Sequence, residues 1–266
     1  MKTPLNILIL FKEERHASKA DVKTHHQALK TVQATLKKYH LSYETRSRGT
    51  LQAGLTHNFF ISVGGDGTFL EASHYAPPQA LLLGVNSNPH LSHGAFCQAN
   101  AKTFEKTWIK ILQGKASILE LQRLQIFLNQ KPLAVLALND VLLTHPCPAA
   151  TSRYELKVGS KKEEQKSSGI WISTAVGSTA AIRSAGGKVL APDSKKWQFV
   201  VREPFIHPGG KYKMTRGILS PHEKIEIVSK RGEARLFVDG AHLEYEVKYG
   251  DKVKVQLAKS PIRAVL

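Results

Sequence analysis

Residues 59–76 read FFISVGGDGTFLEASHYA, and this stretch decides how the first part of the chain folds. The apolar residues Phe59 to Val63 predict a buried strand, which runs straight into a turn of three glycines around Asp66. Residues Thr68 to Ala76 predict a short helix, because the proline pair at 77–78 cannot continue it. A glycine turn between a strand and a helix is typical of a phosphate site.

Strand and helix signals alternate on both sides of this stretch. Leu5 to Phe11 is an apolar strand, Ala17 to Tyr39 carries apolar residues at helical spacing, and Ala80 to Val85 is a further apolar strand. This order predicts an α/β layer with parallel strands.

The pattern changes after about Lys115 to short alternating segments. Hairpins are predicted around Asn129 to Pro132, near Arg231 and Gly232, and at Tyr249 to Asp251. No convincing long helix follows, so we expect an antiparallel sheet or sandwich.

The change in pattern divides the chain into two predicted domains. Residues 1–105 form an α/β domain that carries the glycine turn, and residues 106–266 form a β-rich domain. The last strand is a candidate to return to the first domain. With 266 residues and 42% hydrophobic content, the chain is long enough for two domains with proper cores.

Composition excludes several classes of protein. No apolar run reaches the roughly 18 residues that a membrane span needs, so we expect no membrane partner. The two cysteines form neither a disulfide framework nor a metal-ligand spacing, which favours a cytoplasmic protein without a metal held directly by a side-chain cluster.

The formal net charge of +17 favours anionic ligands. The basic residues are dispersed, however, and no nucleic-acid-binding motif is present, so we expect no nucleic-acid partner. A basic surface that is merely solvated explains the charge equally well.

Asp66 decides whether the glycine turn only binds phosphate or also performs chemistry. Glycines at 64, 65 and 67 let the backbone approach a phosphate, and the amides that open the helix at Thr68 favour its charge. A carboxylate repels phosphate, so its presence makes sense if it takes a proton from an attacking hydroxyl or holds a magnesium ion. The alternative is a turn acid that bonds only to its own backbone.

Two later stretches offer contacts for a nucleoside. Asn139 and Asp140 are adjacent in an apolar strand, so at least one points into apolar surroundings, where a ribose diol or a purine edge would satisfy it. Lys166 to Gly187 contains a strand, a turn of small and hydroxylated residues and a short helix, with Ser178 or Thr179 placed as its N-cap. For the first stretch the alternative is a bulge or a strand end exposed to water, and for the second it is an ordinary capped helix.

In this order, these pieces resemble the NAD kinases. The matching segments are GGDGTFL at 64–70, GVN at 84–86, Asn139-Asp140, TAVGSTAA at 174–181 and Asp239-Gly240. The resemblance spans residues 5 to about 265, and the phrases KSSG at 166–169 and VREP at 201–204 are more similar to the mitochondrial-type branch of that family than to the common bacterial one.

The resemblance implies an enzyme that transfers a phosphoryl group from ATP to the 2′-hydroxyl of the adenosine ribose of NAD, giving NADP, with Mg2+ as the cofactor. It also implies a Rossmann-like α/β domain followed by a β-rich NAD-binding domain, in a homodimer or homotetramer. Asp66 would be the catalytic base. The residues implied for phosphate and ATP binding are Gly64, Gly65, Gly67, Thr68 and Lys166. Those implied for NAD binding are Phe69, Asn86, Asn139, Asp140, Thr174, Thr179, Ala180 and Ser184.

Two departures from the family pattern and two rival functions stay open. Ser168 and Ala181 replace an acid and an aromatic residue of common members, so the hold on the nicotinamide end and the choice between NAD and NADH are not fixed by the pattern. GGDGT also occurs in diacylglycerol and sphingosine lipid kinases, but the GTxNDxAR-like stretch of those enzymes is missing after the next strand. A non-catalytic dinucleotide-binding regulatory protein is the other alternative.

Overall fold

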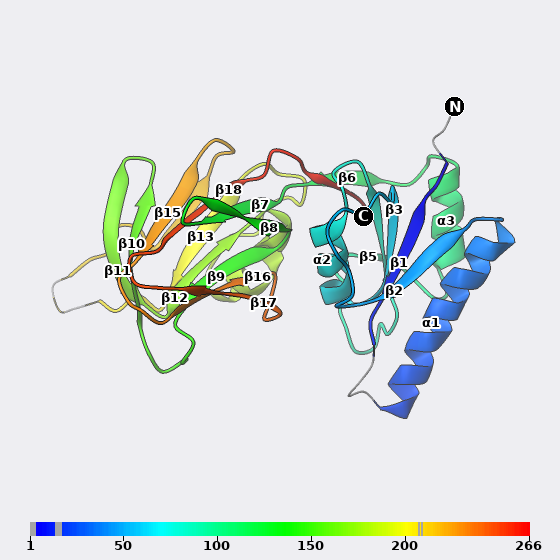
Figure 1. Cartoon of the computed structure of the whole chain (residues 1–266), viewed down its shortest axis with the longest axis horizontal. Coiled ribbons are helices and arrows are strands. Elements are labelled where there is room, and N and C mark those ends of the chain that lie inside the picture. Colours follow the sequence, from blue (N-terminus) through cyan, green and yellow to red (C-terminus); the bar gives the residue numbers. More distant parts are fainter. Residues whose placement is uncertain (1–3, 14–17, 207, 209) are drawn as a thin grey trace. The chain divides into compact units, whose positions relative to one another are not determined.

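The computed structural model describes residues 4–13, 18–206, 208 and 210–266. The chain forms two compact units, one of Met1–Glu120 with Ile262–Leu266 and the other of Leu121–Pro261 (Figure 1). The division lies after Glu120, later in the chain than the boundary predicted after residue 105. The end of the chain belongs to the first unit.

The first unit is a seven-stranded sheet with the order β2-β1-β3-β4-β19-β6, in which β5 pairs with β4. Strand β1 pairs in parallel with β2 and β3, and β4 pairs in parallel with β3, β5 and β19. The strands are β1 (Ile7–Phe11), β2 (Tyr43–Ser47), β3 (Phe59–Gly64), β4 (Leu81–Asn86), β5 (Cys97–Asn100), β6 (Ile118–Leu121) and β19 (Ile262–Val265). The helices are α1 (Lys19–Lys38), α2 (Asp66–Tyr75) and α3 (Phe104–Leu112).

The core of this unit forms because β1 and β3 are largely apolar and almost completely buried, as expected for strands that have neighbours on both sides. Helix α1 buries Ala28, Val32 and Leu36 in the same core. The rings of Trp108 from α3 and Phe59 pack edge to face, with centroids 5.2 Å apart. These contacts hold β3, and therefore the glycine turn at its end.

Helix α2 begins at Asp66, two residues before the predicted start at Thr68, and ends at Tyr75, just before the prolines. The reason is that the carbonyl of Gly65 already accepts the amide of Thr68 at 3.0 Å, so the helical bonding starts inside the turn. Asp66 is thus the first helical residue, where a negative charge is favoured.

The second unit is a sandwich of two six-stranded sheets in which the recorded strand pairs are antiparallel. Their orders are β11-β10-β15-β18-β7-β8 and β14-β13-β12-β9-β16-β17. The strands of the first sheet are β7 (Leu124–Leu128), β8 (Lys131–Ala137), β10 (Ser152–Val158), β11 (Lys161–Ser167), β15 (Lys224–Ser229) and β18 (Lys252–Leu257). Those of the second are β9 (Asp140–Thr144), β12 (Gly169–Ser173), β13 (Trp197–Arg202), β14 (Arg216–Leu219), β16 (Ala234–Val238) and β17 (Leu243–Val247).

One apolar core, with Ile126, Leu156, Ile172 and Leu236 among its members, joins the two sheets of the sandwich. Between β12 and β13 lie a short 3-10 helix, η1 (Val176–Thr179), and the short helix α4 (Ala181–Ser184). The predicted fold class, an α/β domain followed by a β-rich sandwich, is confirmed.

Two of the three predicted hairpins are wrong. The turn at Asn129 does join a pair, β7 and β8. The turns near Gly232 and Gly250 instead carry the chain from one sheet to the other, because β15 pairs with β10 and β18, whereas β16 pairs with β9 and β17. Alternating strands on the two sides of a turn look the same in sequence whether they pair or face each other across a core.

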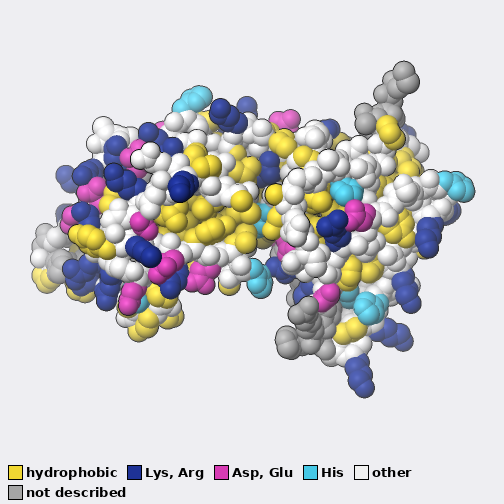
Figure 2. All heavy atoms as spheres, viewed as in Figure 1, with side chains coloured by type: hydrophobic (Ala, Val, Ile, Leu, Met, Phe, Trp, Pro, Cys, Tyr) yellow, Lys and Arg dark blue, Asp and Glu magenta, His cyan; other side chains and the backbone are white. Residues whose placement is uncertain are grey.

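The surface carries many basic side chains. Figure 2 shows Lys and Arg side chains at the β10–β11 end of the second unit and along α1, with Asp and Glu between some of them. Among the residues that the structure describes, no helix is long and apolar enough to cross a membrane.

Candidate active site

The glycine turn is packed tightly at its first position, so that a side chain there would force a neighbour to move. A Cβ placed on Gly64 would lie 2.2 Å from the hydroxyl oxygen of Thr68. That hydroxyl is buried and has no hydrogen-bond partner within the described part of the chain. A buried hydroxyl without a partner at the start of a helix is a group that a bound phosphate or metal ligand would satisfy.

Asp66 does not bond to its own turn. Its two carboxylate oxygens accept the backbone N–H groups of Ala95 at 3.0 Å and Phe96 at 2.8 Å, in the segment between β4 and β5. The alternative of a turn acid satisfied locally is therefore not what the structure shows. A carboxylate has about four acceptor positions, so one that is fixed by two amides still has capacity for a proton or a metal ion.

Asn86 builds the segment that holds Asp66. Its amide nitrogen donates to the carbonyl of Ser92 at 3.0 Å, and its oxygen accepts the N–H of Asn88 at 3.1 Å. Gly94 lies against this amide with φ +64°, a conformation that favours glycine. The side chain predicted to bind NAD is thus already used to shape the 87–96 segment.

Phe69, also predicted to bind NAD, has a fully buried side chain. Its ring stacks on Phe96, with centroids 5.0 Å apart and an interplanar angle of 5°. The stacking supports Phe96, the residue whose amide holds Asp66, and the NAD contact of Phe69 stays a prediction.

Arg48 and Glu71 were missed by the sequence analysis. Glu71 on α2 accepts from Nε of Arg48 at 2.9 Å and from the N–H of Gly49 at 2.6 Å. The terminal nitrogens of Arg48 lie against the glycine turn, since a Cβ on Gly67 would be 3.2 Å from Nη1. A guanidinium in this position offers donors to an anion on the turn. No sequence pattern marks it, because it follows β2, a strand without an apolar run.

Cys97 borders the same segment. Burial, with a smaller contribution from the charge of Asp66, raises the pKa of its thiol to about 12. The thiol is therefore protonated at neutral pH and is not a nucleophile.

In the second unit, Asp239 holds the chain just before β9. Its carboxylate accepts the N–H groups of Leu138 at 2.7 Å, Asn139 at 2.7 Å and Asp140 at 3.0 Å. Its own N–H donates to the carbonyl of Asp140 at 3.0 Å. In the sequence Asp239 is marked only by the Asp-Gly motif of the family resemblance; its role as the residue that shapes the Asn139-Asp140 pair comes from the structure.

Asn139 and Asp140 are both unusual polar groups. The side-chain oxygen of Asn139 is buried and has no hydrogen-bond partner among the described residues. Asp140 is 6% exposed, and burial together with the negative charge of Asp239 raises its pKa to about 7. A buried amide without a partner next to an acid with a perturbed pKa is typical of a ligand site.

The turn after β12 packs directly on this pair. The hydroxyl of Thr174 donates to the carbonyl of Leu138 at 2.6 Å and accepts the N–H of Gly177 at 3.1 Å. A Cβ on Gly177 would lie 2.1 Å from the carbonyl oxygen of Asn139, so only glycine allows the approach. The structure thus brings together the two stretches that were predicted to contact a nucleoside.

The remaining predicted residues lie at the surface of the second unit. Thr179 and Ser184 are exposed and Ala180 is half-buried. Ala180, not Ser178 or Thr179, occupies the N-cap position of α4, because Ser178 is buried and its hydroxyl accepts the N–H of Leu190 at 2.9 Å. The ammonium of Lys166 on β11 lies 4.0 Å from the ring centroid of Phe205.

Within the described residues, no group of three or more His, Cys, Asp or Glu side chains could hold a metal ion. The side-chain oxygens at the glycine turn are those of Asp66 and Thr68, in the first turn of α2. Oxygens are the ligands that Mg2+ prefers.

A carboxylate fixed inside a glycine turn, and in the other unit an Asn-Asp pair with a buried amide oxygen and a buried carboxyl group, define a nucleotide-dependent phosphotransferase. Residues 120–266, more than half of the chain, match the family described as the ATP-NAD kinase C-terminal domain. The chain belongs to the ATP-NAD kinase family, so the predicted family and the kinase function are confirmed.

The chain is similar to a probable NADH kinase of Oryza sativa subsp. japonica, with 34% identity over 227 residues that cover 77% of this chain and 70% of the relative. It is also similar to an NAD kinase of Aquifex aeolicus, with 29% identity over 245 residues, 88% of this chain and 86% of the relative. Its fold matches the crystal structure of an NAD kinase from Archaeoglobus fulgidus in complex with ATP, with a TM-score of 0.76, 21% identity and coverage of 98% and 94% of the two chains.

Proposed function

We propose that this protein transfers the terminal phosphoryl group of ATP to the 2′-hydroxyl of the adenosine ribose of NAD, giving NADP and ADP. The observation that carries the proposal is Asp66, whose carboxylate is held by two backbone amides within the glycine turn of a chain that belongs to the ATP-NAD kinase family. An acid without a chemical role in the turn would not need two backbone amides to hold its carboxylate.

In the proposed reaction, the 2′-hydroxyl oxygen attacks the terminal phosphorus of ATP and the bond from that phosphorus to the bridging oxygen of ADP breaks. Asp66 takes the proton of the attacking hydroxyl. The backbone of the turn and the start of α2 hold the phosphates, and Arg48 offsets their charge. Magnesium bound with ATP would supply further positive charge, with Asp66 and Thr68 as the residues in reach of it.

For the acceptor, we propose that the second unit holds the adenosine of NAD. The unpartnered oxygen of Asn139 is suited to the amino group of adenine, and the carboxylate of Asp140 to a ribose diol. NADH is the second candidate acceptor, because a relative with 34% identity is named as a probable NADH kinase. A cytoplasmic location and a homodimer or homotetramer are further parts of the proposal; light scattering would measure the oligomeric state.

The test is an assay of the purified protein with ATP, Mg2+ and either NAD or NADH, in which NADP or NADPH is measured. Asp66→Asn should lower kcat by about 10²- to 10⁴-fold, the usual effect of losing a general base, and should leave NAD binding intact. Glu105→Gln, which neutralises a half-buried acid on α3 that pairs with Lys38, is the matched control and should leave kcat unchanged. Near-normal turnover by Asp66→Asn would remove Asp66 from the catalytic role, and phosphorylation of lipid vesicles in place of NAD would favour a lipid kinase.

A further inference from the structure

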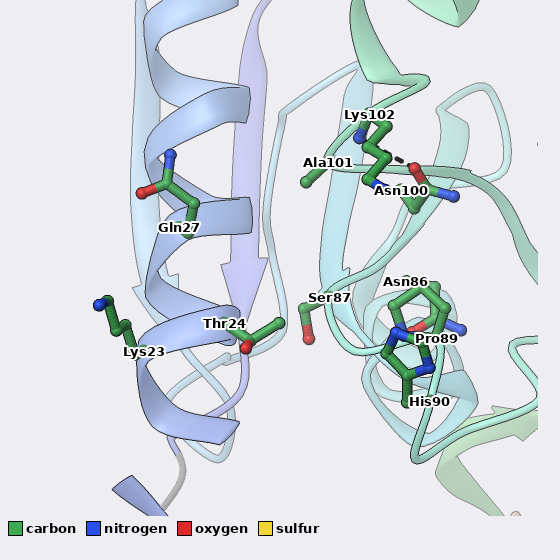
Figure 3. Close-up of a pocket in the computed structure, with 10 residues that line it drawn as sticks. All are labelled: Lys23, Thr24, Gln27, Asn86, Ser87, Pro89, His90, Asn100, Ala101 and Lys102. Atoms are coloured by element: carbon green, nitrogen blue, oxygen red, sulfur yellow. Dashed lines mark hydrogen bonds between the residues drawn. The ribbon is translucent and has the colours of Figure 1, made fainter. Parts of the chain in front are cut away.

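Two pockets with lysines in their linings lie in different units. The pocket of the first unit, with a volume of about 540 Å³, lies between α1 and the segments that follow β4 and β5 (Figure 3). It includes Asn86 and Ser87 beside the glycine turn, so we count it with the ATP site of the proposed function. The other pocket, of about 520 Å³, lies on the second unit, and its lining contains none of the residues assigned to ATP or NAD.

The pocket of the second unit lies on the outer face of the sheet β11-β10-β15-β18-β7-β8. Successive side chains of a strand point to opposite faces of its sheet. On β15, Ile225 and Ile227 belong to the core of the sandwich. Lys224, Glu226 and Val228 therefore point outward, and the same alternation holds on β10 and β18.

A short side chain among long ones makes this face hollow. Val228 lies between Glu155 of β10 and Lys252 of β18, which are its partners in the register of the strands. Lysines at 157 and 254 lie in the next outward row of the same face. Because Val228 does not reach as far out as these side chains, it forms the floor and they form the walls.

The lining carries an excess of positive charge. It contains five lysines, at positions 157, 162, 224, 252 and 254, and two glutamates, at 155 and 226. Glu155 pairs with Lys162 at 2.9 Å. Glu226 pairs with Lys157 and with Lys224, each at 3.2 Å. Five lysines against two glutamates leave three positive charges that no carboxylate of the lining offsets, which favours an anionic ligand.

Lys252 and Lys254 supply donors for such an anion. The backbone N–H of Lys252 donates to the side-chain oxygen of Asn129 at 2.9 Å, but its ammonium group makes no hydrogen bond or ion pair within the described part of the chain. The ammonium group of Lys254 lies 3.9 Å from the ring centroid of Phe127, so a ring and not a carboxylate orients it. Lysine ammonium groups bind phosphate as compact point charges.

The spacing of the lysines favours an anion with several charged groups. They extend over four neighbouring strands, from β11 to β18, which corresponds to roughly 14 Å at the usual distance between strands. Lys157 and Lys162 lie directly opposite each other across β10 and β11, an arrangement in which like charges repel. A single phosphate would reach one end of this row, whereas a chain of linked phosphates would offset the charge along it.

We propose that this outer face binds a free anion with three or more linked phosphate groups, with Lys252 and Lys254 as its main contacts and Val228 as the floor of the site. The site does not rest on the proposed kinase function. Only the folded chain brings together the lysines of four strands, so the anion would also raise the thermal stability of the protein.

The test is isothermal titration calorimetry with tripolyphosphate, without Mg2+ and with ADP in excess to fill the proposed ATP site. We expect one tripolyphosphate per chain. Lys252→Gln should weaken its binding about tenfold, as expected for the loss of a contact between charged groups. Lys195→Gln, which neutralises an exposed lysine of the same unit outside the pocket, is the matched control and should leave the Kd within twofold. Equal effects of the two variants would overturn the proposal.

A second pair of variants tests the shape of the site without a change of charge. Val228→Tyr fills the hollow with a residue that strands accept well, and should weaken tripolyphosphate binding at least tenfold. Ala134→Tyr places the same side chain at an exposed position of β8, in the same sheet but outside the pocket, and should have no effect. Unchanged binding by Val228→Tyr would show that no defined site exists on this face.

The ligand class is tested with other anions. Inorganic phosphate and citrate should each bind at least tenfold more weakly than tripolyphosphate, and equal affinity for either would overturn the proposal. Vesicles of phosphatidylserine that bind through Lys252, with no binding of tripolyphosphate, would assign the face to a lipid surface and would also overturn it.

Turnover separates this inference from the proposed function. In the NADP assay without tripolyphosphate, Lys252→Gln should leave kcat and both KM values unchanged. Tripolyphosphate binding through Lys252 in a protein that forms no NADP or NADPH would sustain the inference and refute the proposed function. NADP formation by a protein that binds no tripolyphosphate in the presence of ADP would do the reverse.

Discussion

Arg48 is held in place by Glu71 with its terminal nitrogens against the backbone at Gly67, so a phosphate on the turn would meet donors already oriented. We predict that Arg48→Ala raises KM for ATP about tenfold, since a hydrogen bond between charged groups contributes about 1.5–3 kcal/mol and this guanidinium is partly exposed. KM for NAD should change little. Steady-state kinetics with each substrate varied in turn is the measurement.

Arg46→Ala is the control for this prediction. Arg46 lies in β2, two residues before Arg48, and pairs with Glu44 of the same strand. If both variants raise KM for ATP equally, the effect comes from a general loss of positive charge, and Arg48 has no special place in the site.

Asp140 is expected to make the stability of the protein depend on pH. Its pKa is raised from 3.8 to about 7 by burial and by the charge of Asp239. The unfolded chain loses this proton near pH 4, whereas the folded protein keeps it up to about pH 7. Between these values the folded state binds more protons, so the contribution of Asp140 to stability falls as pH rises, and above pH 7 its ionised form costs about 4 kcal/mol.

Because the contribution of Asp140 to stability falls as pH rises, we can predict how Asp140→Asn behaves. Relative to the wild type, the variant should gain stability between pH 4.5 and pH 8, by up to about 4 kcal/mol, because the amide is never ionised. Urea unfolding at several pH values measures this difference. Asp193→Asn, at an exposed position of the same unit, should show no such trend. A pH-independent difference for Asp140→Asn would mean that the carboxylate is solvated in solution.

At the scale of elements, the start of α2 depends on the absence of a side chain at Gly64. We predict that Gly64→Ala lowers the free energy of unfolding by about 1–3 kcal/mol, because the new methyl group overlaps Thr68 and moves either that side chain or the helix. ATP binding should fall with it. Gly232→Ala is the control, since a Cβ there meets nothing within 4 Å. Thermal unfolding and ADP titration of both variants check the prediction, which equal behaviour of the two would contradict.

The elements that sequence predicts are those whose environment is uniform along the strand. The strands β1, β3 and β4 are buried on both faces and therefore appear as apolar runs. Among the described strands, β2 pairs with β1 alone and forms an edge of the sheet. Its sequence, YETRS, carries no apolar run, and the strand was not predicted. Arg48 follows directly after β2, which is why this part of the site was missed together with its strand.

Pairing between elements is harder to predict than the elements. The β15–β16 and β17–β18 connections were predicted as hairpins but cross between the two sheets, because register and partner are set by contacts far apart in sequence. The same holds for the site. Asp66 and Asn139-Asp140 are marked by local patterns, but the amides at Ala95 and Phe96 that hold Asp66 come from the other end of a long segment.

At the scale of the whole molecule, the sequence contains 38 basic and 21 acidic residues, and the resulting net charge of +17 is spread over both units. A surface of this kind attracts any anion, and both proposed substrates are anions. We predict that kcat/KM falls as KCl is raised from about 50 to 300 mM, because the Debye length shortens over this range. The fall should be steeper for ATP than for NAD, since ATP with its magnesium carries the larger negative charge. Viscosity matched with sucrose is the control, and rates that do not respond to salt would show that the basic surface is only solvated and has no part in substrate capture.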